Sequence, residues 1–183
     1  MRFLFIHGTG GGPQECWYPW LKEILEEKGH EVIVPQFPTP YNQNLDNWLT
    51  VVKPYWQYFD ENLVLVGRSI GVPFVLRLLE RSPRKIKAAF FVAGFYEDVP
   101  EKQFYNVVHS FVDNEFNWLK IKGNCEQFFV YHADDDPIVP LEMGEELAGR
   151  LNVRVQVIPH GEHLWFEKFP EILPGIGSLE KRA

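Results

Sequence analysis

The sequence lacks the features that mark secreted and membrane proteins. Only two of its 183 residues are cysteine, and Cys16 and Cys125 lie too far apart for a disulfide framework or a C-x-x-C motif. Its apolar runs are far shorter than the ~20 residues that cross a bilayer, and the few apolar residues before His7 are too short for a signal peptide. We therefore expect a cytoplasmic protein with reduced thiols and no membrane partner.

Positive charge is also scarce. The chain has 18 Lys and Arg against 25 Asp and Glu, a net charge of −7, and no basic run. A protein that binds nucleic acid needs a cationic surface to displace counterions from phosphates. The composition therefore argues against a nucleic-acid partner. It also offers no cluster of Lys or Arg for a phosphorylated or polyanionic substrate.

The composition is otherwise that of a globular protein, with 45% hydrophobic and 23% charged residues. The length suits one domain, residues 1–183. Short apolar runs predict six strands, at residues 2–6, 31–34, 63–66, 86–92, 127–131 and 153–158. Helical spacing of apolar residues predicts helices between them, at about residues 17–28, 45–52, 74–79 and 141–151, and a last one after His163 that Pro170 and Pro174 break.

Strands that alternate with helices indicate an α/β fold in three layers. We expect a mostly parallel, twisted sheet of about six strands with helices on both faces. Ligands of such sheets bind at the carboxyl ends of the strands, where the connecting loops meet. Candidate functional residues should therefore lie in the loops that follow the strands.

One such loop contains the sequence Gly67-Arg68-Ser69-Ile70-Gly71. It follows an apolar strand, precedes an apolar helix and matches G-x-S-x-G, in which a strained turn lifts a nucleophilic serine above the sheet. Glycine on either side lets the strand and the helix pack closely. The alternative is a glycine-rich turn with a serine that only caps the helix. The choice depends on whether the chain supplies a base and an acid for Ser69.

A serine nucleophile needs a histidine base. His163 follows the last predicted strand in a Gly-x-His setting and is the preferred base. His160 lies in the same loop, where we expect it to be exposed or to support the site, and His132 ends the preceding strand. The chain order of a serine, an acid and then His163 is the order found in the fold that carries this serine turn.

The acid candidates are crowded into three consecutive residues. Asp136 is preferred because it directly precedes Pro137 and the next helix, from where a carboxylate can reach the loop of His163. Asp135 is the next choice, Asp134 is expected to be a turn residue, and Asp98 is a distant alternative. Three adjacent carboxylates repel one another, so an imidazolium, a helix N-terminus or solvent must offset that cost.

Two backbone N–H groups are expected to form an oxyanion hole. One belongs to Ile70, directly after the serine, and the other to Thr9 in the glycine-rich loop after the first strand, with Gly10 as the alternative. A dinucleotide-binding G-x-G-x-x-G motif would need glycine where Pro13 stands. We therefore expect no nucleotide cofactor. A serine nucleophile with a base and an acid also needs no other cofactor, and we expect none.

With these residues in place, the chain resembles the α/β-hydrolase superfamily, and within it the small serine hydrolases of the retinoblastoma-binding-protein-nine and YdeN group. The likeness extends over most of the chain and is carried by residues 8–11 with 17–21, 66–71, 116–125, 135–140 and 161–163. Arg68 stands where that group more usually has histidine. The resemblance implies a minimal hydrolase core without a large lid domain, and a triad of Ser69, Asp136 and His163.

The sequence thus predicts an enzyme, a serine hydrolase that cleaves a small ester, thioester or amide through an acyl-enzyme on Ser69. Aromatic residues between the fourth and fifth strands either pack onto the core or line an apolar acyl pocket, for which Gly10, Trp17 and Tyr96 are candidate contacts. The natural substrate, the choice between ester, thioester and amide, and the oligomeric state do not follow from the sequence.

Two other classes of function are open. The first is a protein-interaction module on a hydrolase fold with weak or no activity, whose partner the sequence does not identify; the resemblance includes proteins discussed as binding partners of others. The second is a metal site built from Asp134, Asp135 and Asp136 with His132 and His160. Adjacent acids rarely converge on one ion without a spacing motif, so no metal is expected.

Overall fold

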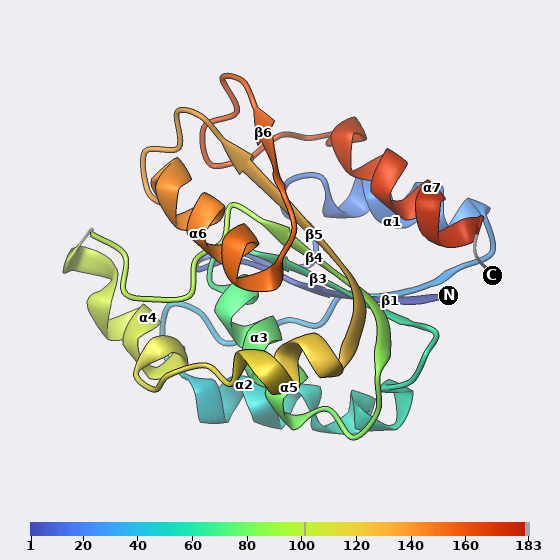
Figure 1. Ribbon diagram of the computed structural model, residues 1–183, viewed down its shortest axis with the longest axis horizontal. Helices are drawn as coiled ribbons and strands as arrows, with labels where there is room; N and C mark the ends of the chain where they lie inside the picture. Colours follow the sequence, from blue (N-terminus) through green and yellow to red (C-terminus); the bar gives the residue numbers. More distant parts are fainter. Residues whose placement is uncertain (101, 182–183) are drawn as a thin grey trace.

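The computed structural model describes residues 1–100 and 102–181. Residues 101, 182 and 183 of the predicted domain lie outside the described residues. The described chain forms a twisted six-stranded sheet in the order β2-β1-β3-β4-β5-β6, in which every neighbouring pair is parallel (Figure 1). The strands are β1 (Arg2–Ile6), β2 (Glu31–Ile33), β3 (Leu63–Arg68), β4 (Ile86–Val92), β5 (Cys125–Ala133) and β6 (Val155–Ile158). The predicted α/β fold is confirmed.

Helices cover both faces of this sheet, because the strands are apolar on both sides (Figure 1). One face is covered by α1 (Tyr18–Glu27) and α7 (Leu173–Glu180). The other face is covered by α2 (Leu45–Val52), α3 (Gly71–Arg81), α4 (Tyr105–Val112), α5 (Trp118–Gly123) and α6 (Leu141–Leu151). Short 3-10 helices follow α2, precede α4 and precede α7, at Lys53–Tyr58, Lys102–Phe104 and Pro170–Ile172.

The predicted elements differ from the observed ones mainly where a boundary is decided by packing. Strand β5 is longer than its apolar run, because pairing with β4 begins at Cys125. Pro174 does not break the last helix: it lies in the first turn of α7, where a missing N–H leaves no bond unmade. Helices α4 and α5, between β4 and β5, were not predicted, because each has only one or two buried side chains.

Arg77 of α3 anchors the segment that contains α4. Its side chain is buried, and its guanidinium donates hydrogen bonds to the carbonyls of Phe111 and Asn114 and pairs with Glu80 at 3.0 Å. It also stacks on the ring of Phe116 at 3.8 Å. These contacts fix α4 against the core beside the carboxyl ends of β3 and β4, so that α4 can form one wall of a site there.

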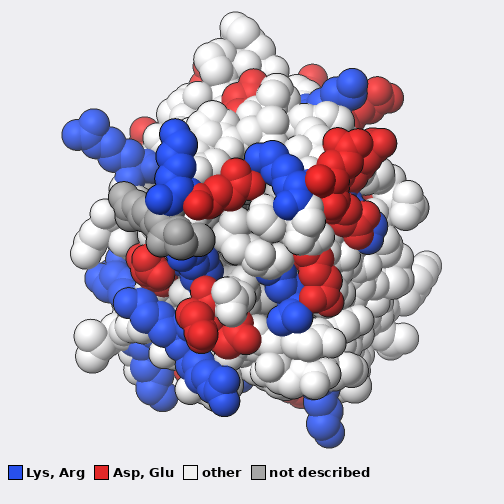
Figure 2. Space-filling view, turned by 90° about the vertical axis from the view of Figure 1, so that its right-hand side faces the viewer, with Lys and Arg blue, Asp and Glu red and all other residues white. Residues whose placement is uncertain are grey.

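The charged side chains on the surface and the two free cysteines are as the composition indicates. On the face that Figure 2 shows, Lys and Arg side chains are interspersed with Asp and Glu rather than gathered into one field. Cys16 and Cys125 are both free, and burial raises the pKa of each thiol to about 12. Among the described helices, none is both long and apolar enough to cross a membrane.

Candidate active site

Ser69 lies on the turn between β3 and α3. Its backbone φ is 54°, in the left-handed region that residues with a Cβ avoid, and its N–H donates to the carbonyl of Val92 at 2.9 Å. A Cβ on Gly67 would lie 2.7 Å from the carbonyl oxygen of Gly71, and one on Gly71 would lie 2.4 Å from that of Ile6. The glycines on both sides are therefore required by the close approach of β3, α3 and β1, as the sequence predicts.

His163 lies in the loop after β6 and its side chain is 2% exposed. Its Nε2 accepts a hydrogen bond from the hydroxyl of Ser69 at 3.1 Å, and its Nδ1–H donates to Oδ2 of Asp136 at 2.7 Å. The indole N–H of Trp17 donates to the carbonyl of Leu164 at 3.2 Å and ties this loop to α1. The structure thus brings a hydroxyl, an imidazole and a carboxylate into one hydrogen-bonded row.

The carboxylate oxygen of Asp136 that does not contact His163 is held by backbone N–H groups. Its carboxylate is fully buried, and Oδ1 accepts the backbone N–H groups of Ile138 and Val139, both at 2.9 Å. Burial raises the pKa of Asp136, but the hydrogen bond and charge of His163, with these two N–H groups, outweigh burial and hold the pKa below its ordinary value. The carboxylate is therefore ionised at neutral pH and accepts the Nδ1 proton.

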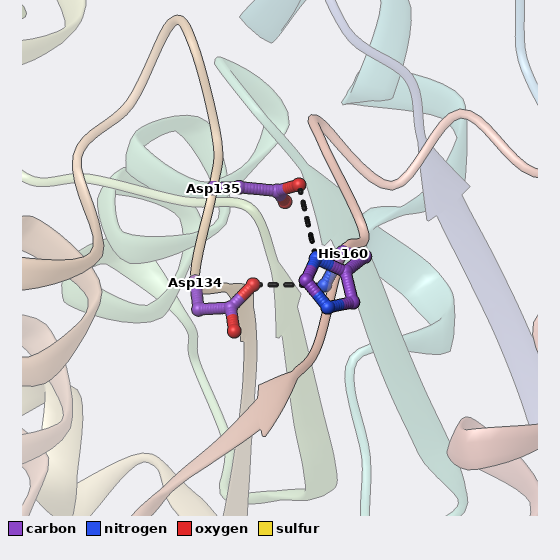
Figure 3. Close-up of side chains that lie close together, drawn as sticks. All are labelled: Asp134, Asp135 and His160. Atoms are coloured by element: carbon purple, nitrogen blue, oxygen red, sulfur yellow. Dashed lines mark hydrogen bonds and ion pairs between the residues drawn. The ribbon is translucent and has the colours of Figure 1, made fainter.

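The other predicted acids do not reach Nδ1 of His163. Asp134 and Asp135 are exposed and turn toward the backbone of the loop after β6, where His160 also lies (Figure 3). Asp98 lies 3.3 Å from the ring of His109 on α4. The preference for Asp136 over the alternatives therefore agrees with the geometry.

Asp134, Asp135 and His160 could together offer ligand atoms to a cation. One atom from each lies within 4.8 Å of the others, and all three residues are exposed (Figure 3). One carboxylate oxygen of each aspartate already accepts a backbone N–H. Exposed groups of this kind are common without an ion, and the cluster carries no assignment here.

His132 belongs to the support of Asp136. It is fully buried on β5, its Nε2–H donates to the carbonyl of Val139 at 2.8 Å, and Nε2 lies 3.7 Å from Oδ2 of Asp136. Burial lowers the pKa of His132, which favours the neutral ring. His132 therefore supports the loop after β5, which contains Asp136, through its hydrogen bond to Val139.

The loop after β1 presents N–H groups to the same end of the sheet. The N–H of Gly10 is already bonded to Oγ1 of Thr39 at 2.6 Å. In the described part of the chain, no acceptor engages the N–H groups of Thr9 and Ile70. The amide of Gln43 supports this loop, because it donates to Oγ1 of Thr9 at 2.8 Å and to the carbonyl of Val107 at 2.9 Å.

A cavity of about 180 Å³ opens beside Ser69. Its apolar wall comes from the segment between β4 and α4, from α4 and from the loop after β5, and is formed by Phe95, Val99, Phe104, Val108 and Ile138. Thr9, Ser69, Ile70 and His163 line it at the reacting end, together with Arg68 and Trp165. The cavity can hold a small apolar group next to the hydroxyl of Ser69.

Three predicted contacts do not line this cavity. Trp17 is fully buried on the opposite side of the sheet, between Phe5 and Phe169. Tyr96 lies in a separate surface groove with its hydroxyl bonded to Glu146 at 3.1 Å. The N–H of Gly10 is bonded to Oγ1 of Thr39 and is not free for a ligand of the cavity. Sequence reasoning placed these residues in the right loops but could not give the direction in which each side chain or N–H points.

Two further residues line the cavity, and the sequence placed neither Arg68 nor Trp165 among the catalytic or substrate-binding residues. Arg68 is 1% exposed, and its guanidinium donates to the carbonyl of His163 at 3.1 Å and lies 3.5 Å from Glu15. Trp165 is 51% exposed, packs edge-on against the ring of His163, and has the Arg68 guanidinium 5.3 Å from its centre. Its place two residues after His163 was the sequence feature that could have found it.

Comparisons with known proteins find hydrolases that are similar to this chain. YdeN of Bacillus subtilis (strain 168), named as a hydrolase, is 29% identical over 164 residues, which cover 88% of this chain and 85% of YdeN. Serine hydrolase RBBP9 of Rattus norvegicus is 24% identical over 97% of this chain and 95% of its own. The crystal structure of the ydeN gene product superposes with a TM-score of 0.92 at 26% identity and covers 98% of both chains.

The predicted resemblance is therefore confirmed, and with it the hydrolase class of the enzyme. The model of one family, described as serine hydrolase, matches residues 3–176, which is nearly the whole chain. The chain belongs to the serine hydrolase family.

Proposed function

We propose that the protein hydrolyses esters of small apolar carboxylic acids through an acyl-enzyme on Ser69. The observation that carries the proposal is the hydrogen-bonded row from Oγ of Ser69 through the ring of His163 to Asp136, with distances of 3.1 and 2.7 Å. A serine hydroxyl is a weak nucleophile until a base takes its proton, and a base is effective when an acid fixes its tautomer.

In the proposed reaction, Oγ of Ser69 attacks the ester carbonyl while its proton passes to Nε2 of His163. Asp136 stabilises the imidazolium that forms. The carbonyl oxygen becomes an oxyanion, for which the N–H groups of Thr9 and Ile70 are the proposed donors. The tetrahedral intermediate collapses, the alcohol leaves with the proton from His163, and the acyl group stays on Oγ.

Water then completes the cycle. His163 takes a proton from a water molecule, whose oxygen attacks the acyl carbonyl, and the second tetrahedral intermediate releases the carboxylic acid as Oγ regains its proton. Each step uses groups already positioned around the cavity. No metal or cofactor is needed for this proton balance.

The cavity limits the acyl group. A cavity of about 150 Å³ lined by apolar side chains is enough to bind benzene, and this one has about 180 Å³. Its wall includes the rings of Phe95 and Phe104. Of the lining side chains that the structure describes, Arg68 is the only Lys or Arg, and its guanidinium is engaged by the carbonyl of His163 and by Glu15. We therefore propose short-chain aliphatic or single-ring aromatic acyl groups.

A panel of p-nitrophenyl esters tests this function. The acetate, butyrate and benzoate esters should be cleaved with a higher kcat/KM than the laurate ester, whose chain exceeds the cavity, and Ser69→Ala should abolish all of these activities while the protein stays folded. Turnover that Ser69→Ala leaves unchanged would refute the role of Ser69. An equal or higher rate on laurate would refute the proposed acyl class.

A further inference from the structure

The loop that carries His163 has an unusual backbone. His160, Glu162 and Leu164 have φ values of 53°, 48° and 53°, so every second residue from 160 to 164 is in the left-handed region. Residues with a Cβ adopt this conformation at a cost in free energy, and they keep it where surrounding contacts hold them. The contacts that hold this loop therefore decide where the imidazole of His163 lies.

Two carboxylates of the loop after β5 supply such contacts. Oδ1 of Asp134 accepts the backbone N–H of His160 at 2.8 Å, and Oδ1 of Asp135 accepts that of Glu162 at 2.7 Å. Figure 3 shows the two aspartates on one loop, directed at the neighbouring loop that carries His160. Hydrogen bonds from N–H groups to a charged acceptor are shorter and stronger than those between neutral groups. The two residues that donate these N–H groups, His160 and Glu162, both have a positive φ.

The same arrangement explains how three adjacent aspartates coexist. Asp136 turns inward with a fully buried carboxylate, whereas the side chain of Asp135 is 43% exposed. Each carboxylate has its own partner on the loop after β6: the N–H of His160, the N–H of Glu162 and the Nδ1–H of His163. The three carboxylates therefore point in different directions, and a hydrogen-bond donor offsets the negative charge of each one.

We propose that Asp134 and Asp135 are positioning residues of the active site. They hold the loop of His163 in its left-handed conformation and so keep the imidazole between Ser69 and Asp136. The inference rests on the proposed function, because it assigns a purpose to the position of His163. Asp135 has the larger effect, because its partner Glu162 directly precedes His163.

The kinetic test compares Asp135→Ala, Asp135→Asn and the double variant Asp134→Ala/Asp135→Ala on p-nitrophenyl butyrate. Misplacement of a reacting group by about 1 Å can cost about 100-fold in rate, so we expect kcat to fall about 10- to 100-fold in Asp135→Ala, with little change in KM. The amide oxygen of Asn still accepts the N–H of Glu162, and Asp135→Asn should keep most of the activity.

Asp60→Ala is the matched control. Asp60 also accepts a backbone N–H, that of Asn62 at 2.9 Å, but it lies in the turn before β3, at the opposite end of the sheet. It should change kcat little. A loss of activity that came only from a weakened turn on the surface would appear in this variant as well.

A second readout follows the imidazole itself. The Nδ1 proton of His163, in its 2.7 Å bond to Asp136, should give a downfield proton NMR signal, which is assigned by its absence in His163→Ala. We expect this signal to shift or broaden in Asp135→Ala and in the double variant, and to persist in Asp135→Asn and Asp60→Ala. Circular dichroism of each variant confirms that it is folded.

The outcomes separate this inference from the proposed function. Absence of ester turnover by the wild type would count against the proposed function, while the NMR comparison would still decide the positioning role. Unchanged kcat and an unmoved Nδ1 signal in the folded double variant would overturn the inference. An equal loss in Asp135→Ala and Asp135→Asn would also overturn it, because the accepting oxygen would then not be what matters.

Discussion

The guanidinium of Arg68 donates a hydrogen bond to the carbonyl of His163 at 3.1 Å and so joins two loops that are 95 positions apart in the sequence. The same group lies 3.5 Å from Glu15 in the loop after β1. Arg68 is nearly fully buried, and these partners compensate its charge. One side chain therefore links the serine turn, the loop of His163 and the first loop of the site.

Removal of this link should impair the site. In Arg68→Met the loop of His163 loses a donor and Glu15 loses its cation, and we expect kcat on p-nitrophenyl butyrate to fall by about tenfold or more. Arg150→Met is the control, since Arg150 is an exposed arginine that stacks on Tyr96 and Trp118 away from the cavity. If both variants kept wild-type kcat, Arg68 would have no part in positioning His163.

The close packing at the serine turn predicts opposite effects for two glycine substitutions. Gly71→Ala places a Cβ 2.4 Å from the carbonyl oxygen of Ile6, and we expect it to lower the free energy of unfolding by about 3 kcal/mol. Gly149→Ala lies inside α6 with no atom within 4 Å of the added Cβ, and it should raise that free energy by up to about 1 kcal/mol. Urea denaturation measures both. A neutral Gly71→Ala would contradict the packing argument.

The cavity wall predicts how substitutions change the preferred acyl group. Val108 is buried and lines the cavity, so Val108→Trp should fill it and lower kcat/KM for the butyrate ester by about tenfold or more relative to acetate. Phe104→Ala should enlarge the cavity and shift the preference toward longer chains. The control is Leu119→Ala, a change at an 84% exposed position outside the cavity. A preference that does not move in either cavity variant would place the acyl group elsewhere.

Two buried histidines predict a loss of stability in mild acid. His7 donates from Nδ1 to the carbonyl of Gly8 and accepts the N–H of Phe37 at Nε2, and burial lowers its pKa as it does that of His132. The carboxylate of Asp136 partly opposes the effect on His132. In the unfolded chain both rings bind protons near their ordinary pKa of 6.5, whereas in the folded protein they resist protonation.

The free energy of unfolding should therefore fall as the pH is lowered below 6.5, by at most about 1.4 kcal/mol per pH unit for each of these histidines. Urea denaturation at pH 7.5, 6.5 and 5.5 measures the slope. His132→Gln should reduce it, because one of the two groups is removed. Stability that rises between pH 6.5 and 5.5 would contradict the neutral state of both rings.

The sequence could predict the row of Ser69, His163 and Asp136 because each residue lies in the loop or turn after a predicted strand, and the carboxyl ends of parallel strands converge at one edge of the sheet. Local sequence also separated the three acids, since Asp136 alone directly precedes Pro137, and its carboxylate accepts the N–H of Ile138 in the turn before α6. The parallel sheet with helices on both faces followed from the alternation of strands and helices.

The supporting contacts could not be predicted in this way. Gln43 joins Thr9 to Val107, 34 and 64 positions away, through one amide group that no local pattern distinguishes. The direction of Trp17 depends on a partner, Leu164, that is 147 positions away. The position of α4 depends on Arg77, which bonds to the carbonyl of Phe111 and whose charge would ordinarily suggest an exposed site. These features become visible only when the chain is folded.

Whether Ser69 is an activated nucleophile is tested most directly by intact-mass analysis after exposure to a fluorophosphonate probe. We expect one covalent adduct on the wild-type protein and none on folded Ser69→Ala or His163→Ala. Folded wild-type protein that gains no adduct would contradict it. A protein-interaction role on an inactive hydrolase fold would then be the better explanation of the same geometry.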